Sequence, residues 1–178
     1  MTEPGRPSSE AVAHLDGLVE SEARQRLLRC CGASRWVEAM LRARPFGSPS
    51  ALLSAADEVW GHMEARDYLE AFAHHPEIGS DLGELRKKFA STAELSLGEQ
   101  AGATTASEAT LLALRAGNRA YRERFGYSFI VCATGKTALE MLSLLEQRLP
   151  NPADAELGVA AAEQAKITRL RLEKLEAS

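Results

Sequence analysis

Two short polar motifs carry the residues of this chain that are best suited to chemistry. The His75-Pro76 pair places an imidazole before a proline, and Ser96-x-x-Glu99-Gln100 places a hydroxyl, a carboxylate and a carboxamide close together. A proline restricts the residue before it to extended backbone, so His75 should leave its helix in a fixed direction. An imidazole with a carboxylate can move protons, and an amide can hold a small polar substrate. The two motifs together predict an acid/base site that needs no cofactor.

Each motif also has a purely structural interpretation. Pro76 can simply end a helix, and His75 is then a solvated residue near the negative C-terminal end of that helix. A serine followed three residues later by a glutamate, as in Ser96 and Glu99, is the capping box that opens helices. Gln100 is not needed for that box. A helix cap that also lines a pocket satisfies both interpretations.

Other kinds of site find less support in the sequence. Ala133-Thr134-Gly135-Lys136-Thr137 resembles the end of a phosphate-binding loop, but Ile130 stands where that loop needs its first glycine. This apolar run suits a pocket wall better. The four histidines lack the paired spacing of a helical zinc site and no Cys-x-x-Cys occurs, so we expect no metal. A Gly-x-Ser-x-Gly hydrolase motif is also missing from the sequence.

The last helix offers a positive charge. On a helical wheel the apolar residues between 167 and 175 form an arc, and Arg171 points near its middle whereas Arg169 points roughly opposite. Arg171 should therefore face inward. An inward arginine either pairs with a structural carboxylate or holds an anionic ligand with two parallel hydrogen bonds. The helix geometry leaves both roles open.

The elements that must position these residues are helices. Ser34 is expected to cap a helix that continues to Leu41, and Gly32 and Gly126 are expected to end the helices before them. The spacing of apolar residues predicts the other helices over 10–18, 20–31, 50–63, 65–74, 81–90, 99–103, 107–124, 137–149 and 153–175.

The fold class predicted from this pattern is all-α. Residues 128–133 are the one strand-like run, and a single strand cannot form a sheet, so we expect an extended segment that crosses near the active site. In the helix over 107–124, a common stripe is formed by Leu111, Leu114, Asn118 and Tyr121. We therefore predict a single-domain multi-helix bundle over residues 10–178, preceded by a disordered leader over 1–9.

Composition limits the classes of partner. The 178 residues are 45% hydrophobic, enough for one core, and the net charge of -4 is no basis for binding nucleic acid or an anionic membrane. Cys30 and Cys31 are neighbours that cannot easily bridge each other, so reduced thiols and a cytoplasmic location are expected. No run approaches the roughly 18 apolar residues of a membrane span. We expect a small-molecule substrate, no nucleic acid and no membrane.

Several separated stretches resemble the 2-oxo-4-hydroxy-4-carboxy-5-ureidoimidazoline (OHCU) decarboxylases, which are enzymes of urate breakdown. The likeness runs from Leu28 onward, and the order and spacing of the stretches make chance an unattractive explanation. The stretches are Cys30-Cys31-Gly32-Ala33-Ser34-Arg35-Trp36, Arg44-Pro45-Phe46, His75-Pro76-Glu77-Ile78-Gly79, Ser96-x-x-Glu99-Gln100, Asn118-x-x-Tyr121, Phe125-Gly126-Tyr127-x-Phe129-Ile130 and Lys166-Ile167-x-x-x-Arg171-Leu172.

The resemblance implies an all-helical, commonly dimeric enzyme without metal or organic cofactor that forms (S)-allantoin in purine catabolism. At the matching positions His75 would be the catalytic residue and Glu99 would assist it. Ser128 and Thr134 depart from the family pattern, which puts the contacts around them in question. The implied substrate contacts are Pro76, Ser96, Gln100, Phe129, Val131, Cys132, Ala133, Thr134, Gly135 and Arg171.

Two other functions stay open on the sequence alone. A helical interaction module would bind a partner helix in an apolar groove, and it predicts a broad exposed apolar stripe. A relative with the same fold could instead act on another ureido acid. A turnover assay separates the enzymes from the module.

Overall fold

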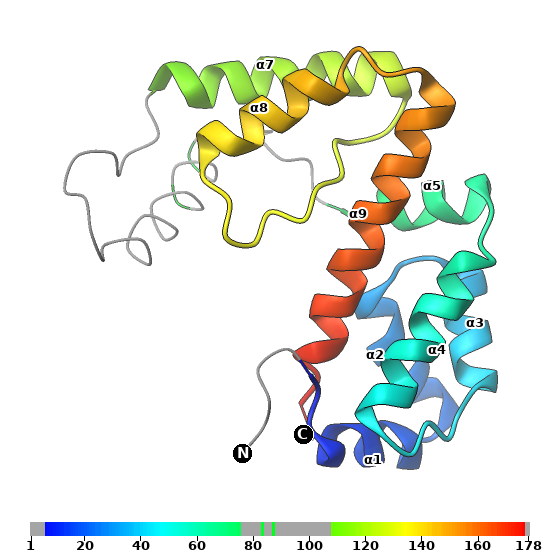
Figure 1. The fold of residues 1–178 in the computed structure, drawn as a ribbon. Coiled ribbons are helices and arrows are strands. Elements are labelled where there is room, and N and C mark those ends of the chain that lie inside the picture. Colours follow the sequence, from blue (N-terminus) through cyan, green and yellow to red (C-terminus); the bar gives the residue numbers. More distant parts are fainter. Residues whose placement is uncertain (1–5, 76–82, 84–86, 88–107, 177–178) are drawn as a thin grey trace. The chain divides into compact units, whose positions relative to one another are not determined.

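The computed structural model describes residues 6–75, 83, 87 and 108–176, which form eight helices and no strand (Figure 1). The all-α prediction is confirmed, whereas the predicted helices over 81–90 and 99–103 fall almost entirely outside the described residues. None of the described helices is both long and apolar enough to cross a membrane. The helices are α1 (Ser9–Gly17), α2 (Glu20–Cys30), α3 (Ser34–Arg42), α4 (Pro49–Gly61), α5 (Ala65–Ala73), α7 (Glu108–Phe125), α8 (Ala138–Arg148) and α9 (Ala153–Glu173).

The chain divides into two compact units. Unit 1 consists of Met1–His74 with Ala161–Ser178, and unit 2 consists of His75–Ala160. The long helix α9 supplies residues to both units, and the single domain expected over 10–178 stays a prediction.

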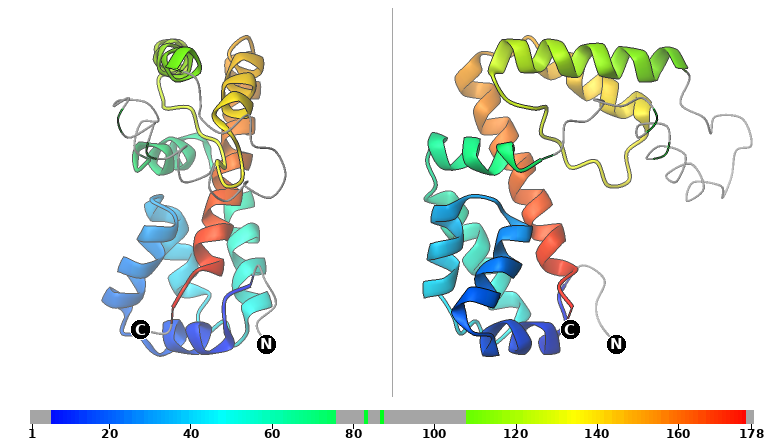
Figure 2. Two further views of the ribbon diagram at one scale, coloured as in Figure 1. Left: turned by 90° about the vertical axis from the view of Figure 1, so that its left-hand side faces the viewer. Right: turned by 180° about the vertical axis from the view of Figure 1, so that it is seen from behind.

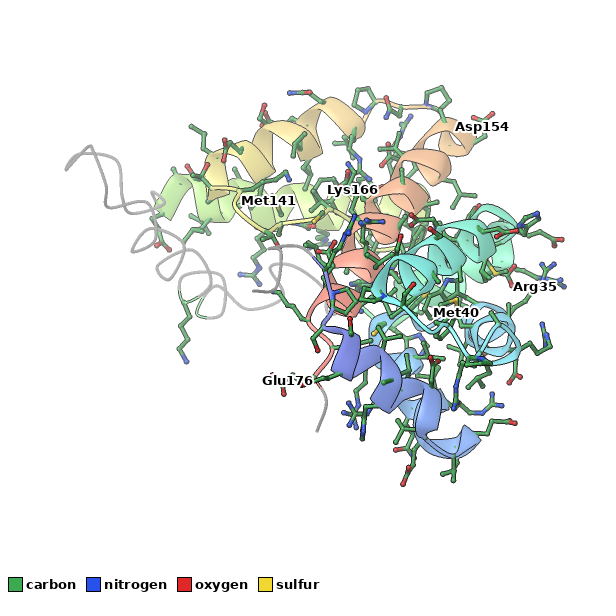
Figure 3. The ribbon with its side chains drawn as sticks, turned by 60° about the horizontal axis from the view of Figure 1, so that its bottom comes forward. Arg35, Met40, Met141, Asp154, Lys166 and Glu176 are labelled. Carbon is green, nitrogen blue, oxygen red and sulfur yellow. The ribbon has the colours of Figure 1, made fainter. Side chains whose placement is uncertain are left out.

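Unit 1 packs the amphipathic face of α3 against its neighbours. Trp36 and Met40 are fully buried, and the Trp36 indole N–H donates to the carbonyl of Ala56 in α4 at 3.3 Å. Met40 lies among the helices in Figure 3, whereas Arg35 projects from the surface. The Trp60 indole N–H donates to the carbonyl of Ala161 at 3.0 Å, which joins α4 to the C-terminal part of α9. Buried tryptophans with a satisfied N–H thus link three helices of the unit.

The start of α1 corrects the predicted leader. The Ser8 hydroxyl accepts a hydrogen bond from the backbone N–H of Ala11 at 3.0 Å, so Ser8 caps the helix and Ser9 is its first residue. Pro7 is buried. The boundary predicted at residue 9 therefore lies too late in the chain, because the cap recruits Ser8 and Ser9 to the helix. Residues 1–5 of the leader lie outside the described part of the chain.

Two helix-boundary predictions in unit 1 were wrong. Ala33 rather than Ser34 precedes α3, and the backbone N–H and hydroxyl of Ser34 both donate to the Glu70 carboxylate, at 3.1 and 2.5 Å. Gly32 lacks the left-handed backbone of a helix-ending glycine. A Cβ at Gly32 would instead lie 2.4 Å from the His74 ring. Gly32 is thus required for close packing rather than for a turn.

Unit 2 is built on two helices and the segment that joins them. α7 and α8 run side by side in the same direction, and residues 126–137 cross back from the end of one to the start of the other (Figures 1 and 2). Gly126 has φ of +81° and its N–H donates to the carbonyl of Arg122 at 2.8 Å, so it ends α7 as predicted. Residues 128–133 form neither a helix nor a strand, which agrees with the crossing segment predicted there.

The core of unit 2 lies between α7, α8 and the crossing segment. All four residues of the predicted stripe on α7 are buried, which confirms that stripe. From α8 the core takes Met141 and Leu145, and from the segment it takes Phe129 and Val131. The Tyr121 ring packs edge-on against Phe129 with centroids 5.2 Å apart. The segment is therefore held by its own apolar side chains as well as by its ends.

Candidate active site

His75, the predicted catalytic residue, directly follows the end of α5. The helix ends at Ala73 with His74 as its C-cap, close to the predicted end at residue 74. The His75 side chain is half-buried. Pro76, Ser96, Glu99 and Gln100 lie outside the described residues, so their convergence on His75 stays a prediction.

The predicted pocket wall from Phe129 to Gly135 lies in unit 2. The side chains of Phe129 and Val131 are 2% and 5% exposed and belong to the core formed with α7 and α8. Ile130 and Cys132 are also buried, at 2% and 8% exposed, but do not belong to that core. A substrate contact by Phe129 or Val131 would therefore have to use backbone atoms.

The end of this segment is a turn that leads into α8. Thr134 and Gly135 are exposed, and Gly135 has φ of +76°, a conformation that favours glycine. The Lys136 amine donates to the carbonyl of Cys132 at 2.7 Å, so this lysine is used to close the turn. Thr137 is the N-cap of α8. This part of the chain therefore forms a helix cap rather than the phosphate-binding loop that its sequence resembles.

The cap at Thr137 is a complete capping box with Glu140. The Thr137 hydroxyl accepts from the Glu140 N–H at 3.2 Å, and the Glu140 carboxylate accepts from the Thr137 N–H at 2.7 Å. The donated backbone N–H holds the pKa of the Glu140 carboxyl below its usual value. Lys136 and Thr137, which resembled the end of a phosphate-binding loop, are therefore used in the turn and in the helix cap.

A buried ionic network lies behind the crossing segment. The guanidinium of Arg148 is 2.6 Å from the Glu156 carboxylate and donates to the carbonyl of Ile130 at 2.8 Å. The Tyr121 hydroxyl donates to the same Glu156 oxygen at 2.5 Å, and the Asn151 amide donates to the other oxygen at 2.7 Å. Burial, followed by the bond to Glu156, raises the pKa of Tyr121 far above its usual value. Each side chain of the network has a hydrogen-bond partner within it, and Arg148 also binds a backbone carbonyl of the predicted pocket wall.

The sequence analysis missed this network, although helical spacing could have revealed it. On α8, Arg148 continues the buried stripe of Ala138, Met141 and Leu145. Charged residues are rarely buried unless they are paired, so an arginine on an apolar stripe indicates a buried carboxylate nearby. On α9 the buried residues recur every four positions as Glu156, Ala160, Gln164, Thr168 and Leu172.

Arg171 lies in unit 1 and faces partly inward, as its place on α9 predicted. It is half-buried, and its Nη1 donates to the carbonyls of Arg29 and Cys30 at 3.3 and 3.2 Å. These carbonyls end α2, where the helix dipole favours a cation. Arg169 is more exposed and pairs with Asp57 at 3.0 Å. Among the described residues Arg171 pairs with no carboxylate, so the structural ion pair considered from sequence does not form there.

A cavity of about 600 Å³, open to solvent, surrounds Arg171 within unit 1. Its lining contains one negative side chain, that of Glu176, and four positive side chains, those of Arg26, Arg29, Arg171 and Lys174. Such a lining provides local positive charge in a chain whose net charge is -4. An anionic ligand would be attracted to it.

His74 and Cys30 also line this cavity, although the sequence assigned neither of them to the site. The Nδ1 atom of His74 is 3.0 Å from the carbonyl of Glu70, which orients the ring. Burial raises the pKa of Cys30 to about 12 and that of Cys31 to about 11, and all three cysteines are free thiols. Cys30 and Cys31 are therefore protonated near neutral pH. Across the described residues, no three His, Cys, Asp or Glu side chains are grouped to hold a metal ion.

The sequence was then compared with known proteins. The profile of the OHCU decarboxylase family matches residues 16–173. A uric acid degradation bifunctional protein of Arabidopsis thaliana is 39% identical over 148 residues, which are 82% of this chain and 45% of that protein. This chain thus spans less than half of the length of the Arabidopsis protein.

Two further comparisons extend over most of both chains. A 2-oxo-4-hydroxy-4-carboxy-5-ureidoimidazoline decarboxylase of Amia calva is 33% identical over 77% of each protein. A solved structure of OHCU decarboxylase in the presence of (S)-allantoin has a TM-score of 0.68 and 36% identity, and the match covers 83% of this chain and 94% of that chain. Because the family profile covers most of the sequence and the Amia calva protein is matched over more than two thirds of its own length, this chain belongs to the OHCU decarboxylase family.

Proposed function

We propose that this chain catalyses the decarboxylation of 2-oxo-4-hydroxy-4-carboxy-5-ureidoimidazoline to (S)-allantoin in urate catabolism. The observation that carries the proposal is the family match over residues 16–173. It is supported by the resemblance to a decarboxylase whose structure was solved in the presence of (S)-allantoin. The reaction needs no metal or organic cofactor in this proposal, and the enzyme is a cytoplasmic homodimer.

The chemistry of this substrate explains why no cofactor is needed. A hydroxyl and a carboxylate share one ring carbon, and the adjacent ring carbon carries a carbon–nitrogen double bond. As carbon dioxide leaves, the electron pair of the broken bond moves toward that imine. Pyridoxal and thiamine usually provide such an electron sink, and here the substrate provides its own. The protein has only to position groups and move protons.

The proton transfers fall to His75 in this proposal. Its unperturbed pKa near 6.5 allows the imidazole to accept or share the substrate hydroxyl proton. Glu99 orients the imidazole or a substrate nitrogen. The enol-like product then receives a proton on one face of the ring, which yields the S enantiomer. The position of His75 directly after α5, where a following proline would restrict its backbone, supports this assignment.

The substrate contacts follow the same proposal. Pro76, Ser96 and Gln100 contact the substrate beside His75, and the stretch from Phe129 to Gly135 forms a wall. The burial of the Phe129 and Val131 side chains supports a contact through backbone groups. Arg171 binds a ring carbonyl or ureido oxygen rather than the departing carboxylate. A tight grip on a charge that disperses during the reaction would stabilise the ground state more than the transition state.

The proposed function is tested by adding the protein to freshly made substrate and following circular dichroism. The wild type should accelerate the formation of optically active allantoin. His75→Asn should fold and lose roughly 10²- to 10⁴-fold in rate, the usual contribution of positioned proton transfer. Wild-type kinetics in His75→Asn would contradict the catalytic assignment, and an inactive wild type would contradict the function.

His62→Asn is a matched control for this experiment. His62 also follows a helix end, and its Nδ1 is 2.8 Å from the carbonyl four residues earlier. This exposed histidine should be replaceable without a change in rate. Glu99→Gln keeps the shape of the side chain and should lower the rate, whereas Glu99→Ala could also lose the proposed helix cap, at about 1 kcal/mol.

The interaction module finds less support in the described residues. Its broad apolar stripe would require exposed apolar side chains along one face. The exposed large apolar residues are instead spread over five helices and the N-cap of one of them, namely Val19, Leu28, Leu69, Leu112, Leu139 and Val159. Such scattered residues are normal on protein surfaces. An enzyme acting on another ureido acid is separated by offering that acid in the same assay.

A further inference from the structure

The buried network of unit 2 ends on a backbone group of the crossing segment. Arg148 is 7% exposed, and its Nη1 donates to the carbonyl of Ile130 at 2.8 Å. Its guanidinium also lies over the Phe129 ring, with the carbon 4.6 Å from the ring centroid. One side chain therefore contacts two consecutive residues of the segment, one through its backbone and one through its ring.

The rest of the network holds Arg148 in place. Its Nε donates to Glu156 at 2.8 Å, and Nη2 lies 3.4 Å from the Tyr121 hydroxyl, so all three guanidinium nitrogens are engaged. Glu156 is fully buried and is also bound by Tyr121 and Asn151. Planar guanidinium groups with several bonds have little freedom to move. The position of the Ile130 carbonyl is thus set by α7, α8 and α9 together.

We infer that Arg148 is a positioning residue, which holds the stretch from Phe129 to Gly135 in the shape that the substrate meets. The inference rests on the proposed function in one respect, namely that this stretch is a wall of the active site. Phe129 and Val131 anchor one face of the stretch in the core, and Arg148 fixes the backbone between them. Without that bond only the buried side chains of residues 129–131 hold the backbone between the anchors. Arg148 itself does not contact the substrate in this assignment.

The first test measures the order of the segment and needs no substrate. Hydrogen exchange is followed by mass spectrometry on peptides that cover residues 126–137, in the wild type and in Arg148→Gln. The shorter, neutral side chain cannot bind Glu156 and Ile130 together. Exchange over 126–137 should increase by about tenfold or more, because local opening becomes easier. Unchanged exchange in a folded Arg148→Gln would overturn the inference.

The second test measures steady-state kinetics on the proposed substrate. Arg148→Gln should raise KM by roughly 10-fold or more with a smaller change in kcat, because a misplaced wall loses binding that the ground state and the transition state share. A residue that merely supports the fold would alter the amount of active enzyme and leave KM unchanged. Increased exchange with an unchanged KM would also overturn the inference, because the segment would then not form the wall.

Two controls separate positioning from stability. Leu15→Ala removes a buried side chain of α1, and Leu52→Ala removes one of α4. Both residues belong to unit 1 and lie outside the network and the core of unit 2. Both should lower Tm and leave KM and exchange over 126–137 near wild type. An equal rise in KM in either control, at a matched loss of Tm, would contradict a specific role for Arg148.

Arg148→Lys covers the case in which Arg148→Gln does not fold. The lysine keeps a positive charge beside Glu156 but cannot engage Ile130 and Glu156 as a fork, so the same rises in exchange and KM are expected. Failure of both variants to fold would overturn the inference in favour of a general role in folding. A wild type without turnover would refute the proposed function alone, since the exchange experiment still reports on the segment.

Discussion

Arg171 in unit 1 and Arg148 in unit 2 both bind backbone carbonyls, but their surroundings are opposite. Arg171 uses Nη1 alone for the carbonyls that end α2, and it lines an open cavity of about 600 Å³. Arg148 is buried, and all three of its nitrogens bind atoms of unit 2. A guanidinium with donors left over in a solvent-open cavity can take a ligand. A guanidinium whose nitrogens are all engaged acts instead through the protein groups that it holds in place.

The carboxylates of the two regions differ in the same way. Glu156 is fully buried beside Arg148, whereas Asp57 is exposed and pairs with the exposed Arg169 in unit 1. Water competes for an exposed ion pair and does not reach a buried one. The comparison therefore predicts that substitutions in the network of unit 2 lower stability and loosen the crossing segment, whereas Arg171 in the cavity of unit 1 acts mainly on ligand binding.

The largest effect is expected from Glu156→Ala. Removing the carboxylate leaves Arg148 buried without its counter-ion, so the free energy of unfolding should fall by about 3–5 kcal/mol. Urea unfolding measures this loss. Asp57→Asn is the control, and its exposed pair should contribute about 1 kcal/mol or less. Equal losses in the two variants would contradict the contrast between the buried and the exposed pair.

Arg171→Ala should act on affinity. Loss of a hydrogen bond from a charged donor costs about 1.5–3 kcal/mol, which corresponds to a KM raised by roughly 10- to 100-fold with kcat little changed. Steady-state kinetics on the proposed substrate measure both constants. Arg169→Ala, on the outer face of the same helix, should leave KM unchanged. A collapsed kcat with an unchanged KM in Arg171→Ala would reverse the role proposed for this residue.

Gly32→Ala should displace His74, which lines the cavity of unit 1. The new methyl group would lie 2.4 Å from the His74 ring, so the ring must move and the free energy of unfolding should fall by about 1–3 kcal/mol. Thermal unfolding and KM are the two measurements. Gly17→Ala, where nothing lies within 4 Å, should change neither of them appreciably. An unaltered Tm in Gly32→Ala would show that His74 can shift freely.

The smallest effect is expected at the end of the crossing segment in unit 2. Thr137→Ala removes the N-cap hydroxyl of α8 and should lower the free energy of unfolding by about 1 kcal/mol. Urea unfolding again measures it. Ser143→Ala, at an exposed position of the same helix, should have almost no effect. A larger loss at Ser143 than at Thr137 would show that the cap does not stabilise this helix.

Helical spacing predicted most of the fold because it depends on neighbours in the sequence. The stripe on α7, the end of that helix at Gly126 and the outward turn of Arg169 are all confirmed. The errors are at Gly32 and Ser34, where a side chain from α5 determines the outcome. His74 occupies the space beside Gly32, and Glu70 takes both donors of Ser34. No local pattern contains such contacts between distant residues.

In the candidate site, too, local features follow from the sequence and contacts between distant residues do not. The sequence by itself determined the family landmarks, the helical elements and the residue types for proton transfer, because these are properties of short stretches. Only the tertiary structure decided that Phe129 and Val131 face a core, that Arg148 holds the Ile130 carbonyl, and that Arg171 lines a cavity with other cations. Burial and the competition among donors for one acceptor arise when separated segments meet, so residue types and their spacing do not contain them.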